Sequence, residues 1–211
     1  MNAVVLGAAP GHHLPMVDQD SPPTFTSAPP ERIPLSAGRA LARLRAARTA
    51  QTVAAINASL DHLSPWMAWA AEPATEETVR TFLEEAEAGW EAGHDFAFAV
   101  VEGTAPDEQV VGGCGLHGRI GPNGLEIGYW IAADRAGRGL ATEVARALTA
   151  AAFDLEAIER VRICCEATNV RSARVPEKLG YQHLRVEVPE AGPCEGRSTQ
   201  IWEVERADWK P

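Results

Sequence analysis

A glycine-containing turn at residues 135–142 constrains the fold of this chain more than any other segment. The pattern predicts a short apolar strand before it, at residues 126–131, and an amphipathic helix after it, with Leu140, Val144 and Leu148 on one side. Gly137 and Gly139 let the backbone approach a ligand closely, and the first turn of the helix points its free N–H groups the same way. The segment therefore predicts a binding site for an anion such as a phosphate group.

Two well-known phosphate-binding loops do not fit this turn. A Walker loop requires Gly-Lys-Ser/Thr, whereas Gly139 is followed by Leu-Ala, so nothing here would reach a γ-phosphate or hold magnesium. A dinucleotide-binding turn requires a third glycine where Thr142 stands, and the expected ribose-binding carboxylate does not follow. What remains is a pyrophosphate bound without metal, by backbone amides and the side chains of Arg135 and Arg138. Coenzyme A carries such a pyrophosphate.

The same turn resembles the acetyl-CoA-binding motif Gln/Arg-x-x-Gly-x-Gly/Ala of the GNAT superfamily of N-acetyltransferases. Aligned by its glycine, the motif falls on residues 136–141. Ala136 then stands where the family has Gln or Arg, and Arg135 is the neighbouring side chain that could substitute for it.

Three further blocks carry the resemblance. Residues 166–181 resemble the signature Asn-x-x-Ser-x-x-Val-x-Glu-Lys-Leu-Gly-Phe of the Rim-type subgroup, which acetylates the N-termini of ribosomal proteins, with Asn169 and Ser172 at its first two polar positions. Residues 126–131 and 64–69 are also similar to that subgroup. The four blocks occur in the family's order, so the chain is identified as a member of the superfamily from about residue 39 onward.

The resemblance implies an α/β GNAT fold, in which a central, mostly antiparallel mixed sheet is flanked by helices and its strands splay around the acetyl-CoA site. It implies acetyl-CoA as the acyl donor, with no metal. The implied donor-binding residues are Tyr129, Trp130, Ile131, Arg135, Gly137, Arg138, Gly139, Leu140, Ala141, Thr142 and Asn169.

Glu126 and Ser172 are the candidate catalytic residues. Glu126 shares a strand face with Gly128 and Trp130, so its carboxylate could accept a proton from an amine directly or through water. The alternative is a solvated carboxylate at a strand start. The resemblance implies that Ser172 protonates the leaving thiolate, although serine is also common in the first turn of a helix. Asn169 has a second role open to it, as the N-cap of the helix that follows.

Four residues are candidates for binding the acceptor. The resemblance of residues 64–69 to the Rim-type block implies that Ser64, Trp66 and Trp69 lie at the mouth of the acceptor groove, and Trp130 is a further candidate for its aromatic wall. The alternative for each tryptophan is a place in the core, because tryptophan is also the largest core-filling residue.

Composition limits the partners. A net charge of -10 argues against nucleic acid or an anionic membrane surface, because such binding depends on Lys and Arg, and it favours an amine-bearing acceptor. No apolar run approaches the ~20 residues needed to span a bilayer, and residues 1–10 lack signal-peptide features, so we expect a cytoplasmic protein. The four cysteines lack zinc-site spacing. The sequence is compatible with a homodimer.

The chain divides into two predicted parts. Residues 1–35 are rich in Pro, Ser, Thr and Ala without periodicity, which predicts a flexible tail, and residues 36–209 form the acetyltransferase domain. Within the domain, apolar spacing predicts helices at residues 49–60 and 76–92. Three glycines in a predicted strand at residues 110–116 suggest a bulge or the close approach of something from outside.

These observations predict an acetyl-CoA-dependent N-acetyltransferase that moves an acetyl group directly to a primary amine. The expected acceptor is the α-amine of a protein, peptide or amino-acid conjugate. Two alternatives remain: an acetyltransferase for a small-molecule or antibiotic amine, and a non-catalytic acyl-CoA-binding protein.

Overall fold

The computed structural model describes residues 25–190, 192 and 194–210. The strands are β1 (Arg32–Pro34), β2 (Arg39–Arg43), β3 (Asp95–Glu102), β4 (Gln109–His117), β5 (Gly124–Ile131), β6 (Arg160–Glu166), β7 (Gln182–Glu187) and β8 (Thr199–Glu205). The α-helices are α1 (Thr49–Asn57), α2 (Leu60–Leu63), α3 (Glu76–Glu91), α4 (Leu140–Phe153) and α5 (Val170–Lys178). Short 3-10 turns lie at Ala46–Arg48, Ala68–Ala70, Ala133–Arg135 and Arg206–Asp208.

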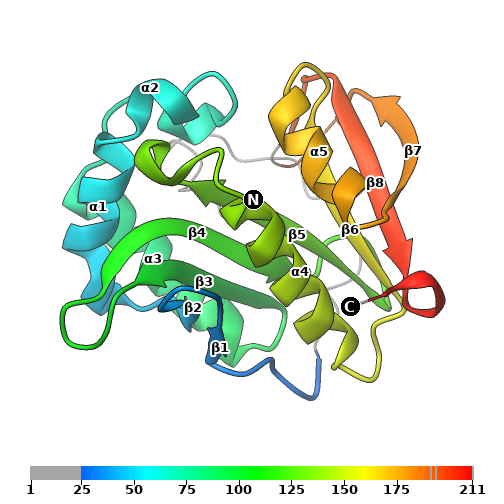
Figure 1. Cartoon of the computed structure of the whole chain (residues 1–211), viewed down its shortest axis with the longest axis horizontal. Coiled ribbons are helices and arrows are strands. Elements are labelled where there is room, and N and C mark those ends of the chain that lie inside the picture. Colours follow the sequence, from blue (N-terminus) through cyan, green and yellow to red (C-terminus); the bar gives the residue numbers. More distant parts are fainter. Residues whose placement is uncertain (1–24, 191, 193, 211) are drawn as a thin grey trace.

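The strands form one sheet in the order β1-β2-β3-β4-β5-β6-β8-β7 (Figure 1). Every neighbouring pair is antiparallel except β5 and β6, which are parallel and are joined through α4. A parallel pair needs such a crossover because the chain must return to the same end of the sheet. The predicted α/β fold, with a mostly antiparallel mixed sheet flanked by helices, is confirmed.

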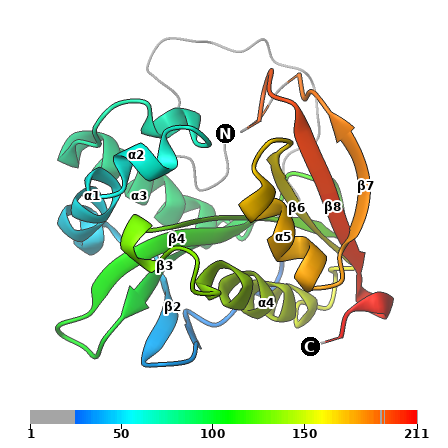
Figure 2. The ribbon, with the colours of Figure 1, turned by 45° about the horizontal axis from the view of Figure 1, so that its top comes forward.

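The helices cover both faces of the sheet. Figure 2 shows α1, α2 and α3 on one side of β3 and β4, with α4 on the other. Strand side chains alternate between the faces, so Ile127 of β5 packs in the α4 cluster while Trp130 packs in the cluster that includes residues of α1 and α3. Helix α3 begins at a capping box between Thr75 and Thr78, and it buries the apolar stripe that the sequence predicts.

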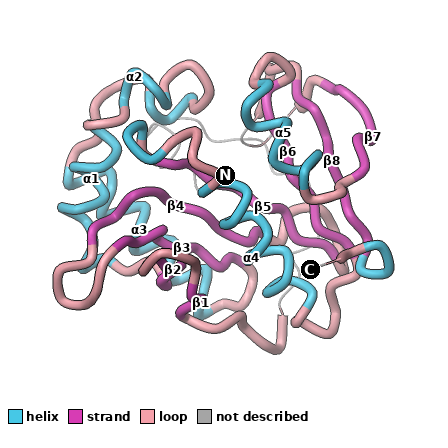
Figure 3. The backbone as a smooth tube through the Cα atoms, viewed as in Figure 1, coloured by secondary structure: helices cyan, strands magenta, loops and turns pink. Residues whose placement is uncertain are grey.

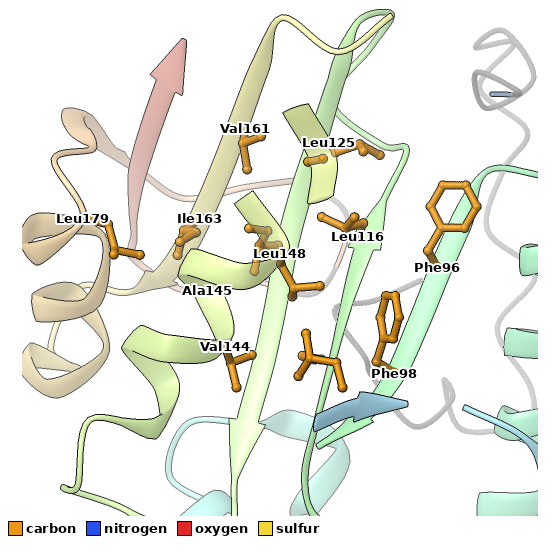
Figure 4. Close-up of a cluster of buried hydrophobic side chains, with 14 of the residues drawn as sticks. Phe96, Phe98, Leu116, Leu125, Val144, Ala145, Leu148, Val161, Ile163 and Leu179 are labelled. Carbon is orange, nitrogen blue, oxygen red and sulfur yellow. The ribbon is translucent and has the colours of Figure 1, made fainter. Parts of the chain in front are cut away.

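The core under α4 is formed from the apolar stripe of that helix and the facing strand residues (Figure 4). Val144 and Leu148 are fully buried against Leu125 and Ile163, which come from the two parallel strands. Burying side chains of this size stabilises the fold by about 1.5–3 kcal/mol each. The helix that begins at the glycine turn is thereby fixed on the sheet.

Strands β5 and β6 separate after a short paired stretch. Their pairing runs from Gly124 and Arg160 to Ile127 and Ile163, but β5 continues to Ile131 and β6 to Glu166 (Figure 3). Beyond Ile127, β5 pairs only with β4 among the described residues. Alternate backbone groups of its last residues therefore point toward the open side of the split.

The glycines of β4 lie beside the bulge that the sequence suggests, whereas the close approach at Gly113 comes from within the chain. The pairing with β3 shifts register between Val100 and Val101, so β4 carries one extra residue. A Cβ atom added to Gly113 would lie 2.5 Å from the indole nitrogen of Trp130. The missing side chain therefore makes room for this tryptophan.

The start of the folded region differs from the prediction that residues 1–35 form a tail. Phe25 is buried, with its ring centroid 6.3 Å from that of Phe96, and its backbone N–H donates to the Gly93 carbonyl. Strand β1 pairs with β2. The sequence did not indicate that this segment packs on the domain, because it is rich in proline and serine and its contacts are with distant residues. Residues 1–24 lie outside the described part.

Among the described residues, no helix has the length and apolar character needed to cross a membrane.

We expect Phe25→Ala to lower the free energy of unfolding by about 3 kcal/mol, because it leaves a cavity beside Phe96. Urea unfolding would measure the change, with Thr26→Ala at the exposed neighbouring position as control. Equal stability of the two variants would show that this segment is dispensable to the fold, as a tail would be.

Candidate active site

A cavity of about 430 Å³ lies where β5 and β6 separate. Five segments line it: residues 126–129 of β5, residues 164–166 of β6, residues 66–69, Asn169 and Ser172 at the start of α5, and residues 192 and 194–197 before β8. Its walls therefore come from segments far apart in the sequence, brought together by the sheet order.

The glycine turn lies outside this lining, at the N-terminus of α4. Gly137 and Gly139 have φ values of 76° and 82°, the left-handed region that glycine adopts without strain. A Cβ at either position would meet nothing within 4 Å, so the surface beside the turn is open. Gly139 is the N-cap, and the N–H groups of Leu140, Ala141 and Thr142 lie in the first helical turn. The turn is a suitable site for a pyrophosphate.

The two arginines of the turn differ. Arg135 lies 2.8 Å from a Glu102 carboxylate oxygen and also pairs with Asp134. Arg138 is exposed. The positive charge of Arg135 is thus already balanced within the protein, which leaves Arg138 as the more available of the two for a phosphate.

Glu126 is buried on the cavity floor and is held by an arginine. Arg119 donates to Glu126 Oε1 from Nη2 at 2.5 Å and from Nε at 3.1 Å. The Cys164 thiol approaches Oε2 at 3.5 Å. Burial acts to raise the pKa of Glu126, but the Arg119 guanidinium outweighs it and holds that pKa below its usual value. Glu126 is therefore a carboxylate at neutral pH, and the prediction of a solvated strand-start carboxylate does not describe it.

Sequence reasoning missed Arg119. The hairpin between β4 and β5 pairs His117 with Glu126, which brings residue 119 back over the same carboxylate. The available signal was the sequence Gly-Pro-Asn-Gly at residues 121–124, which is typical of a hairpin turn and has a basic and an acidic residue on its two sides.

Ser172 lies in the first turn of α5 and meets β5 across the split. Its backbone N–H donates to Asn169 Oδ1 at 3.1 Å, which confirms the N-cap role of Asn169. Its Oγ lies 3.0 Å from the Tyr129 hydroxyl. Asn169, Ser172 and Tyr129 all line the cavity, so capping does not remove Asn169 from the site. The contact with the Tyr129 hydroxyl was not foreseen.

The four acceptor candidates are placed differently. Trp66 and Trp69 are half-buried and line the cavity. Trp130 is buried in the core and meets Trp69 edge to face, with ring centroids 6.2 Å apart, outside the lining. Ser64 is the exposed C-cap of α2, also outside the lining. Trp130 is therefore a core residue that packs behind Trp69. A place in the core was the alternative stated for each tryptophan.

Arg197 joins two walls of the cavity and was not predicted. It donates to the backbone carbonyls of Pro65 and Trp66, at 2.8 and 3.0 Å, and its guanidinium pairs with Glu166 at the end of β6. The tryptophan segment is thereby tied to the sheet by a residue 131 positions away from Trp66.

Three of the four cysteines line the cavity: Cys164, Cys165 and Cys194. Burial raises the pKa of Cys165 to about 11 and also raises those of Cys164 and Cys194. They are therefore thiols rather than thiolates at neutral pH. Within the described ranges, no group of three or more His, Cys, Asp or Glu side chains is arranged to hold a metal ion.

Known proteins resemble this chain in sequence and in structure. YdaF of Bacillus subtilis (strain 168), a candidate ribosomal N-acetyltransferase, is 31% identical over 121 residues, which span 56% of this chain and 64% of that protein. The fold is similar to the microcin C7 self-immunity acetyltransferase MccE in complex with acetyl-CoA and AMP, with a TM-score of 0.73, 19% identity, and 83% and 97% of the two chains covered. It is also similar to Mycobacterium smegmatis RimJ in complex with CoA-disulfide, with a TM-score of 0.70, 19% identity, and 83% and 86% covered.

The family described as acetyltransferase (GNAT) domain matches residues 41–182. That range contains the glycine turn, Glu126, Ser172 and the separating strands. The chain therefore belongs to the GNAT family of acetyltransferases.

Proposed function

We propose that this protein transfers an acetyl group from acetyl-CoA directly to a primary amine, and that the acceptor is the α-amine of a protein or peptide. The observation that carries the proposal is the cavity between β5 and β6, which has the ionised Glu126 on its floor and the Ser172 hydroxyl on its wall. Similarity to YdaF supports a polypeptide acceptor.

The residues present fit the donor. The first-turn amides of α4 and the exposed Arg138 would hold its pyrophosphate, and the open side of β5 offers alternate backbone groups to its pantetheine arm. Asn169 would contact the same arm. The donor supplies an acyl carbon activated by a thiol leaving group.

Transfer from an ammonium acceptor requires that the nitrogen loses two protons, one before it attacks the acyl carbon and one as the C–S bond breaks and the amide forms; the departing sulfur gains one proton and the other passes to water. Glu126 is ionised, so it can attract the ammonium group of the acceptor and receive its proton directly or through water. Ser172 is the hydroxyl on the opposite wall that can donate a hydrogen bond to the sulfur. The cavity thiols have raised pKa values and are weak nucleophiles, which supports direct transfer rather than passage through an acylated cysteine.

The acceptor side combines aromatic and acidic groups. Trp66 and Trp69 offer flat apolar surface to a side chain, while Glu166 and Glu195 place carboxylates around the cavity. A free amine is cationic near neutral pH; because Glu166 is already paired with Arg197, the exposed Glu195 is the carboxylate of these two that favours its approach.

A panel of amines, incubated with the protein and acetyl-CoA and read by mass spectrometry, tests this proposal. We expect a gain of one acetyl group on peptides with a free α-amine and none on the same peptides blocked at that amine. Acetylation of small amines alone would overturn the choice of acceptor. Binding of coenzyme A without acetylation of any amine would show a non-catalytic protein.

The anion site predicts the effect of Gly139→Asp. The variant would place a carboxylate where we propose that the pyrophosphate binds. Coenzyme A should raise the melting temperature of the wild type by binding the folded state, and should no longer do so for the variant. Gly38→Asp is the matched control, because Gly38 also has positive φ and no neighbour within 4 Å of an added Cβ. A normal coenzyme A shift in the Gly139 variant would contradict the assignment.

Glu126→Gln should lower turnover by roughly 10²-fold, as expected for loss of a proton acceptor. It should also lower the free energy of unfolding by about 3 kcal/mol, because the mostly buried Arg119 loses its counter-ion. The ion pair is intact at pH 7. Because the pKa of Glu126 is lower in the folded state than its value of about 4.3 in the unfolded chain, the pair stabilises the fold at pH values above about 4.3. This stabilisation is lost as the pH falls through the folded-state pKa.

Two further variants separate the effects of Glu126→Gln. Glu203→Gln breaks a comparable pair with Arg162, outside the cavity lining, and should lower stability without a similar loss of turnover. Arg119→Gln combined with Glu126→Gln removes both charges and should recover stability but not turnover. A double variant with wild-type turnover, measured by thiol release, would exclude Glu126 from the chemistry.

A further inference from the structure

The Tyr129 hydroxyl forms a side-chain contact across the gap between β5 and the start of α5. Its oxygen lies 3.0 Å from Ser172 Oγ, and both residues line the cavity. The backbone of Ser172 is fixed independently, because its N–H is held by Asn169. The remaining freedom of Ser172 is the rotamer of its side chain and the direction of its O–H bond, and the contact with Tyr129 acts on both.

The direction of the hydrogen bond between the two hydroxyls follows from their acidity. Each can donate one hydrogen and accept others, but a phenol is a stronger acid than an aliphatic alcohol and is the better donor. Burial raises the pKa of Tyr129, against the opposing effect of the Ser172 contact, so the phenol keeps its hydrogen at neutral pH. The Ser172 backbone carbonyl lies farther from the Tyr129 oxygen, at 3.4 Å against 3.0 Å for Oγ, so Oγ is the better placed acceptor. With Tyr129 donating its one hydrogen to Oγ, the Ser172 hydrogen is available to another acceptor.

We infer that Tyr129 is a positioning residue, which donates to Ser172 and so directs the Ser172 hydroxyl toward the departing sulfur. The inference rests on the proposed function, because it assigns a second residue to the thiol side of the transfer. Tyr129 itself exchanges no proton with either substrate. A chain of two donors also strengthens the second hydrogen bond, since each polarises the next.

The chain offers a matched control. It contains two tyrosines, and the hydroxyl of the other, Tyr181, lies 2.6 Å from Thr149 Oγ1 and outside the cavity lining. Tyr181→Phe therefore removes a buried hydroxyl contact of the same kind, away from the site. Both replacements keep the ring and its packing.

The first measurement is independent of turnover. Labelling tyrosine with ¹³C at Cζ gives two NMR signals, which the two Tyr→Phe variants assign. We expect Ser172→Ala to move the Tyr129 signal and leave that of Tyr181 in place, and coenzyme A to perturb the Tyr129 signal alone. A Tyr129 signal unmoved by Ser172→Ala would overturn the inference.

The second measurement is a kinetic double-mutant cycle with acetyl-CoA and a peptide that has a free α-amine. Tyr129→Phe should lower kcat by about tenfold, with the acceptor KM and the coenzyme A Kd near wild type. The same change in a Ser172→Ala background should have no further effect, because the tyrosine acts through the serine. Tyr181→Phe should retain wild-type kcat.

Four results of the kinetic and binding measurements would overturn the inference. Unchanged kcat in Tyr129→Phe, or an equal loss in the Ser172→Ala background, would refute a role through Ser172 while the proposed function stands. Weakened coenzyme A binding with unchanged kcat would make Tyr129 a binding residue only. Absence of acetylation by the wild-type protein would instead refute the proposed function, and the inference with it.

Discussion

The separation of β5 from β6 is the constraint on which the rest of the site depends. Parallel pairing stops at Ile127 and Ile163, yet both strands continue, so their last residues lie along an opening rather than against each other. An unpaired strand edge inside a protein is costly unless its backbone groups find partners. Here the opening is bordered by α5 and residues 66–69, and alternate backbone groups of β5 remain available to a ligand.

The charged groups around this opening are balanced in pairs. Glu126 is matched by Arg119 and Glu166 by Arg197, so these two carboxylates are compensated within the protein. For Glu126 the pairing outweighs burial and holds the pKa of that carboxyl below its usual value, because the Arg119 guanidinium favours the charged form of its partner. The polarity of the cavity is therefore a property of the folded arrangement, which no single residue provides.

The sequence was most informative where the cause was local. The helix at residues 76–92 follows from its apolar spacing, and the glycine turn follows from Gly137 and Gly139 within one short segment. It was least informative where contacts join distant positions. Nothing local to Arg197 indicates that it binds Trp66, and nothing local to Phe25 indicates its packing on Phe96. Tyr129 and Ser172, 43 residues apart, meet only because α5 returns beside β5.

The bridge made by Arg197 has a thermodynamic consequence for whatever enters the cavity. Its guanidinium serves two carbonyls of residues 65 and 66 together with the Glu166 carboxylate, so a ligand that displaces it breaks all these contacts at once. A partly buried carboxylate left alone is unfavourable. An entering molecule that carries its own cation can replace the guanidinium at Glu166, whereas a neutral or anionic one leaves that carboxylate unpaired. The Arg197 contacts therefore favour cationic molecules over neutral or anionic ones in this part of the cavity, because only a cation can replace the guanidinium beside Glu166.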